Sequence, residues 1–264
     1  MNTVKKMIWV TLLALSAPVW VSAQAFVELR DGRRMPVERI LARPDGTLAV
    51  FRDGQPMDIP RDQYIRAVGI RPPQLDRANE LIGGGNASEA VPMLQEILRS
   101  SAFQSWDVVA GVMLANIHLE NDRGIAAQEV VQQLQRRYGD RTNTLFPQVQ
   151  QIEWRARIAS GRVAGLEEEL TQIIRDGRDP GRAGAALLTR GDMKRSRAEL
   201  RPAILDYLRA VYFFRQDENL HAEALFRTGS TFAELGESAN ARRFFNELRQ
   251  RHPNSEFTAR IPRA

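Results

Sequence analysis

The sequence contains no cysteine and only three histidines, His118, His221 and His252. Without cysteine the chain can form no disulfide, no thiolate metal site, no cysteine nucleophile and no lipid tether on an acylated cysteine. The histidines are far apart in sequence, and none has a second ligand three or four residues away, as a helical metal pair would need. No serine elbow or paired base accompanies them. We therefore predict no catalytic residue, no metal and no cofactor.

The sequence also lacks long hydrophobic runs after its first 25 residues. Residues 1–25 begin with two lysines, continue with the apolar run Met7–Leu15 and end in small residues that suit cleavage after Ala23 or Ala25. This pattern is typical of a secretory signal peptide. An uncleaved membrane anchor is the alternative, but the run is shorter than the roughly 20 residues that a spanning helix requires. We expect a periplasmic or secreted protein without a transmembrane segment in its mature chain.

Neither sign of charge is in large excess. Removing residues 1–25 takes away Lys5 and Lys6 and no acid, which leaves 35 of the 37 basic residues against all 32 acidic ones. A balance of +3 is too mild to indicate a nucleic-acid partner. Because Lys194 is the one other lysine, almost all the positive charge is arginine. Arginine forks bind phosphate or carboxylate groups, but the interleaved acids favour a simple coding bias.

Residues 26–70 alternate apolar and polar side chains in short runs, which is the period of β-strands. Three Asp-Gly pairs, at Asp31, Asp45 and Asp53, separate these runs and suit tight hairpin turns. We predict a small antiparallel β-meander or partly closed barrel over residues 26–70. The prolines of residues 71–73 stop strand pairing, so these residues are expected to form a linker.

From residue 74 onward apolar residues recur every three or four positions, which predicts amphipathic helices. The clearest example is a helix over about 222–235, a short turn and a second helix over about 239–251. Gly229 and Ala241 are small, and we expect the two helices to approach closely there. The sequence therefore predicts a helical hairpin.

This hairpin recurs along the chain, with an alanine at the equivalent position of four copies: Ala90, Ala127, Ala203 and Ala241. The gaps are 37, 76 and 38 residues, and the middle gap is twice the last. A degenerate copy is therefore expected near residue 165, with a register that the sequence does not fix. Five hairpins then account for residues 74–257 and leave residues 258–264 as a C-terminal tail.

The pattern resembles the tetratricopeptide repeat, and residues 222–255 match it best. The eight signature positions there hold Leu225, Thr228, Gly229, Phe232, Ala241, Phe245, Leu248 and Pro253. Other copies depart from the signature, because Lys194 and His118 stand where an aromatic residue is usual. The ending of this repeat is similar to that of bacterial cell-envelope proteins, namely the barrel-assembly lipoprotein and the Tol-Pal accessory protein. The resemblance implies a mainly α fold, a tetratricopeptide-like α-solenoid of about five helical hairpins preceded by a small antiparallel β domain.

The resemblance also implies a groove lined by the first helix of each hairpin, in which such proteins hold an extended peptide or a partner's helix. Carried over by position, the peptide-binding candidates are Val112, Asn116, Leu188, Asp192, Arg195, Phe226, Ser230 and Ala233. Asn116 and Ser230 would bond a peptide backbone. Asp192 and Arg195 would recognise charge, and Phe226 would accept a side chain. The alternative is that all are ordinary exposed or half-packed residues.

Other distinctive residues have a structural and a functional interpretation. Trp106 and Trp154 could stack on a ligand, but packing is the preferred use. The stretch 175–201 holds eight basic residues against four acids. It could contact an anionic surface such as a phospholipid headgroup, although a solvated turn between repeats is preferred.

Three functional hypotheses follow. The first is a non-enzymatic protein–protein interaction scaffold of the cell envelope, with a protein or peptide partner in the groove. The second is a permanent structural subunit of an envelope assembly or secretion complex. The third is an enzyme built on the cluster Glu167, Glu168 and Glu169, which is disfavoured because successive helical residues point in different directions.

Overall fold

The computed structural model describes residues 25–139 and 142–262. The predicted signal peptide, apart from Ala25, lies outside these residues. In these two stretches no helix combines the length and the apolar character needed to cross a membrane.

The first part of the described chain is a small antiparallel β region. Its strands are β1 (Phe26–Leu29), β2 (Arg34–Pro36), β3 (Arg39–Ala42), β4 (Leu48–Arg52), β5 (Gln55–Ile59) and β6 (Tyr64–Val68). They form two three-stranded sheets, with the orders β2-β1-β6 and β3-β4-β5. The glycine of each predicted Asp-Gly turn has a positive φ, of 83° at Gly32, 84° at Gly46 and 71° at Gly54. Glycine adopts this conformation without steric cost, which is why these pairs end the strands.

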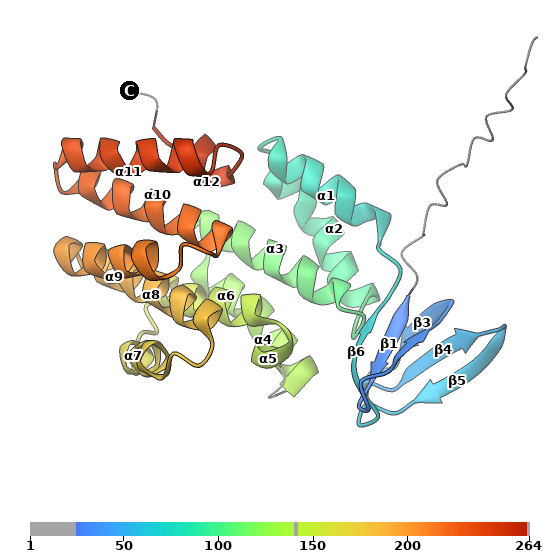
Figure 1. Ribbon diagram of the computed structural model, residues 1–264. Helices are drawn as coiled ribbons and strands as arrows, with labels where there is room; N and C mark the ends of the chain where they lie inside the picture. The colour runs from blue at the N-terminus through green and yellow to red at the C-terminus, as the bar shows by residue number, and fades with distance from the viewer. Residues whose placement is uncertain (1–24, 140–141, 263–264) are drawn as a thin grey trace, which may run out of the picture.

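Helical hairpins make up the rest. They are α1 (Pro73–Gly83) with α2 (Ala87–Ser100), α3 (Trp106–Glu120) with α4 (Gly124–Tyr138), α6 (Pro147–Ala159) with α7 (Leu166–Asp176), α8 (Pro180–Ser196) with α9 (Leu200–Phe213), and α10 (Glu218–Glu234) with α11 (Ser238–Arg251). Two short helices, α5 (Thr142–Leu145) and α12 (Glu256–Ala259), stand outside the hairpins. The hairpins stack into a curved array (Figure 1). The predicted solenoid of about five hairpins behind a small antiparallel β region is confirmed.

The β region is joined to the first hairpins by a shared core. Val27, Leu48 and Leu75 belong to one continuous cluster of buried residues that extends into α6. The Trp106 indole donates a hydrogen bond of 2.8 Å to the carbonyl of Gly69. Pro73, predicted as part of a linker, is the first residue of α1, a position where proline is well tolerated because its missing N–H has no helical partner.

Small residues set the distance between the two helices of a hairpin. Gly229 on α10 lies against Phe245 on α11, so that a Cβ at residue 229 would stand 2.7 Å from Phe245 Cε1. In the preceding hairpin a Cβ at Gly191 would overlap the ring of Tyr207. In both cases the glycine stands twelve residues before the repeated alanine and the ring four residues after it. The recurring spacing is therefore a small-against-large contact across the hairpin.

The third hairpin replaces both small residues by large ones. Trp154 and Leu166 are twelve residues apart and only 1% and 0% exposed. If Leu166 takes the marker position, the four gaps between markers become 37, 39, 37 and 38 residues. The indole and Leu166 pack with Leu170 and Met193 in a separate core, and α6 and α7 do not pack closely along their length as the other hairpins do. In the degenerate copy the large side chain of Trp154 thus keeps α6 and α7 apart.

The same substitution at two glycines tests this packing. Gly229→Ala should lower the free energy of unfolding by about 1–3 kcal/mol, because the new methyl overpacks against Phe245. Gly83→Ala, near the end of α1, should be neutral or raise it by up to about 1 kcal/mol, because no atom lies within 4 Å of the added Cβ. Urea unfolding of both variants measures the difference, and effects of the same sign and size would contradict the proposed contact.

Candidate functional site

A large cavity occupies the concave side of the helical array. Its volume is about 1250 Å³, and its lining residues come from α1, α3, α6, α8 and α10, from the N-caps Asp179 and Asp217 of the last two, and from the segment Asn254–Arg260. These five helices are the first helices of the five hairpins, and no second helix contributes to the lining. We refer to this cavity as the groove.

The structure brings six of the eight predicted residues into the groove. Val112 and Asn116 line it from α3, and four further residues do so from α8 and α10: Leu188, Asp192, Arg195 and Phe226. Ser230 and Ala233 are not among the lining residues, because the part of α10 that lines the groove ends at Arg227. Thus α10, the first helix of the last hairpin, lines the cavity only along its amino-terminal half.

Charged side chains crowd the middle of the groove. Arg227 on α10 donates to Glu223 Oε1 at 2.6 Å and also pairs with Asp192 on α8. Asp192 accepts a second hydrogen bond, of 2.7 Å, from the Tyr207 hydroxyl. Burial lowers the pKa of Arg227 to about 9. Asp192 is therefore engaged within the chain, and its carboxylate orients Arg227 toward the cavity.

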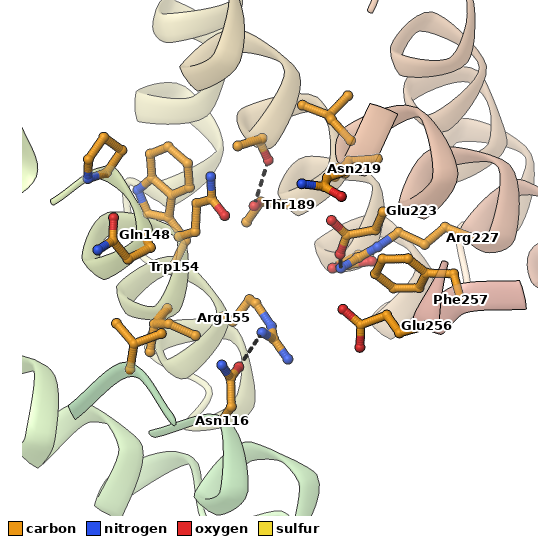
Figure 2. Close-up of a pocket in the computed structure, with 18 of the residues that line it drawn as sticks. Asn116, Gln148, Trp154, Arg155, Thr189, Asn219, Glu223, Arg227, Glu256 and Phe257 are labelled. Atoms are coloured by element: carbon orange, nitrogen blue, oxygen red, sulfur yellow. Dashed lines mark hydrogen bonds and ion pairs between the residues drawn. The ribbon is translucent and has the colours of Figure 1, made fainter. Parts of the chain in front are cut away.

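Arg155 enters the groove from α6. Its Nη1 donates a hydrogen bond of 2.7 Å to the amide oxygen of Asn116. Figure 2 shows Arg155 projecting into the cavity from beside Asn116, with Glu223 and Glu256 on the far wall. Burial lowers the pKa of Arg155, and the side chain to which its guanidinium donates here is a neutral amide.

Sequence reasoning missed Arg155 for a definite reason. It stands eleven residues before Leu166, just as Asn116 and Asp192 stand eleven before Ala127 and Ala203. The same offset would have found it if the register of the third copy had been known. Glu223 and Arg227 occupy repeat positions that were not among those transferred from the tetratricopeptide repeat, and no sequence signal marks them.

Two of the histidines meet, although 31 residues separate them. His221 Nδ1 and His252 Nε2 are 2.8 Å apart across the last hairpin. His221 is only 1% exposed, and its Nε2 has no hydrogen-bond partner among the described residues. The third histidine, His118, is half-buried on α3. In the described part of the chain no three His, Asp or Glu side chains are grouped to hold a metal ion.

Intramolecular pairs occupy much of the basic stretch 175–201. Asp206 is fully buried and accepts from Arg190 and Lys194, and Arg209 completes this cluster. This pairing explains why Lys194 stands where the repeat usually has an aromatic residue. Arg195 likewise pairs with Glu234 at 2.6 Å.

The acidic cluster of α7 does not converge on a common point. Glu167 pairs with Arg197 at 2.9 Å. Glu169 accepts from the Trp154 indole at 2.8 Å and from Arg157 at 2.8 Å. The two carboxylates therefore serve different partners, as the helical geometry predicts.

Comparison with known proteins gives one match. A tetratricopeptide repeat family model matches residues 223–255, which lie within the last hairpin and the turn after it. No curated protein and no solved structure matches the chain significantly. The predicted tetratricopeptide repeat is thus confirmed at the copy where the signature is clearest.

The histidine pair generates a pH prediction. Burial, followed by the charge of His252, lowers the pKa of His221, with Arg251 and Arg215 acting in the same direction and Glu247 opposing them. Below the unfolded value of about 6.5 the unfolded chain therefore binds a proton that the folded chain does not. The free energy of unfolding should fall as pH falls from about 6.5 toward the lower folded pKa, by up to about 1.4 kcal/mol per pH unit.

Urea unfolding of the full chain and of His221→Phe, between pH 7.5 and pH 5.5, isolates this contribution from that of the carboxylates. The variant should lose less stability over this interval. Equal losses in the two proteins would show that His221 does not carry the effect.

Proposed function

We propose that this protein is a non-enzymatic interaction scaffold of the bacterial cell envelope that holds a polypeptide segment of a partner protein in its groove. The observation that supports this most is the composition of the groove. One helix from every hairpin faces it, so a partner lying there would contact the whole array. Tetratricopeptide repeats are generally binding modules, and one is present here.

The size of the groove favours a polypeptide over a small molecule. Its volume of about 1250 Å³ exceeds the roughly 300–1000 Å³ typical of small-molecule pockets. The lining combines apolar side chains such as Val112 and Leu188 with the amides of Asn116, Gln148 and Gln151. Amide side chains both donate and accept hydrogen bonds, which suits the N–H and C=O groups of an extended backbone.

The charges give this groove a means of selecting its partner. We assign Asn116 and Arg155 together to a polar group of the partner, because Arg155 offers further donors beyond the one bound to Asn116. Arg195 lies nearer the rim, paired with Glu234, and both side chains are about 40% exposed. Such exposed pairs are exchanged at little cost, so Arg195 can re-pair with a partner's carboxylate.

The envelope location rests on the sequence of residues 1–25 and on the similarity of the last repeat to envelope repeat proteins. It is therefore part of the proposal, together with secretion into the periplasm or beyond it. Contact with an anionic surface is a weaker element, because Lys194, Arg195 and Arg197 are all paired with acids of the same chain.

A permanent structural subunit is the second candidate, and one surface favours it. On α9 the side chains of Leu205, Tyr212 and Phe213 are 57%, 51% and 77% exposed. They lie on a second helix, outside the groove. Exposed apolar groups gathered on one helix indicate a protein contact, here one that would leave the groove free.

Photo-crosslinking in the cells that make the protein separates these candidates. A photoreactive amino acid at residue 112 or 188 should give crosslinks to a discrete partner. The same group at residue 230 or 233, on α10 but outside the groove, is the matched control and should give few crosslinks. Crosslinks confined to residues 205 and 212 would favour the structural subunit, and no crosslinks at any groove position would contradict the scaffold.

A further inference from the structure

The segment after α11 folds back onto the last hairpin and forms part of the wall of the groove. Glu256, Phe257 and Arg260 line the cavity alongside α10. The Thr258 hydroxyl donates to the carbonyl of His252 at 2.6 Å, and Ile261 is 8% exposed within the core that α10 and α11 share. We call residues 254–261 the return segment.

Two side chains of the return segment lie on Phe226, one of the predicted binding residues. The rings of Phe226 and Phe257 have centroids 5.9 Å apart. The guanidinium of Arg260 lies 5.2 Å from the Phe226 centroid and 5.6 Å from that of Phe257. Aromatic pairs and guanidinium–ring contacts at these distances are attractive. Phe226 therefore already holds an aromatic residue and an arginine three positions later.

The return segment is attached to α10 only through such side-chain contacts. Among the described residues, its hydrogen bonds run to His252 or within the segment itself. Phe257 is half-buried, and Glu256 and Arg260 are exposed. A segment held by two rings, one guanidinium and Ile261 can leave α10 without breaking any hydrogen bond to that helix, while its bonds to His252 tether it to the end of α11.

We propose that the Phe226 end of the groove is a binding seat for a partner segment carrying an aromatic residue followed three positions later by an arginine, and that the return segment occupies this seat until such a partner displaces it. The inference rests on the proposed function of the groove and adds the chemistry of the partner. The aromatic ring packs on Phe226, and the guanidinium lies against both rings. The carboxylate of Glu223, which accepts a hydrogen bond from Arg227, lines the same cavity.

A peptide copy of the return segment tests the seat without knowledge of the natural partner. The probe is the fluorescently labelled peptide Asn-Ser-Glu-Phe-Thr-Ala-Arg-Ile-Pro, which copies residues 254–262. The acceptor is the full chain with Phe257→Ala, Arg260→Ala and Ile261→Ser, which vacates the seat. Fluorescence anisotropy should show binding to this variant. Binding to the unaltered chain should be at least about tenfold weaker, because a tethered competitor acts at an effective concentration of the order of millimolar.

Matched controls decide whether binding is at the seat. Adding Phe226→Ala to the vacated variant, or replacing the peptide's Phe or Arg by Ala, should abolish binding. Equal binding to the unaltered and vacated chains, or binding that survives these replacements, would overturn the proposal. If the peptide does not bind while residues 112 and 188 still crosslink a partner, the seat is wrong and the scaffold function stands.

Hydrogen exchange of the unaltered chain provides a second measurement that does not depend on the folding of any variant. The amides of residues 256–261 should exchange at least about tenfold faster than those in the middle of α11. Protection equal to that of α11 would show that the return segment is a fixed part of the hairpin, and would overturn its displacement.

Discussion

The contact between a small residue on one helix and a large one on its partner is the constraint on which the structure depends. Gly229 against Phe245, and Gly191 against Tyr207, bring two helix backbones together. A side chain at either glycine would push them apart, since protein cores are packed too densely to absorb it. This contact at a constant spacing makes the last two hairpins alike, and similar hairpins stack into a regular curved array.

The groove follows from this regularity, and its irregular features come from the one hairpin that breaks the rule. Trp154 and Leu166 replace the small pair and divide the core, so that one buried cluster extends from the β region into α6 and another from α8 to Ile261. Arg155 is adjacent to this tryptophan and projects into the middle of the groove. The degenerate repeat therefore contributes both the large residues that separate the two halves of the core and one of the charged side chains in the groove, Arg155.

The sequence predicted the strands and the helical hairpins, because both depend on the local periodicity of apolar residues. The alternation in residues 26–70 and the Asp-Gly turns predicted antiparallel strands, and the recurring Ala90, Ala127, Ala203 and Ala241 predicted the hairpins. Position-by-position transfer placed six of its eight residues among those that line the groove, because side chains at equivalent positions of stacked helices share a face. That they bind a peptide stays a prediction. Ser230 and Ala233 lie beyond Arg227, the last residue of α10 that lines the groove.

Contacts between residues far apart in sequence could not be predicted from this local periodicity. His221 and His252 are 31 residues apart and meet only because the last hairpin folds them together. The return segment has no repeat signature, so nothing in its sequence indicated that Phe257 and Arg260 would cover Phe226. The register of the third hairpin could not be predicted because its two marker positions hold the large residues Trp154 and Leu166, where the other copies have glycine or alanine.

The absence of cysteine offers the most direct test of the central claim that the concave face holds a partner. Single cysteines would be introduced at Gln151 and Asn219, which line the groove, and at Arg175 and Arg242, exposed on second helices. Their rates of thiol labelling would be compared in intact cells and in the purified protein. The account predicts slower labelling in cells at residues 151 and 219 only. Slower labelling at residues 175 and 242, with no change in the groove, would contradict it.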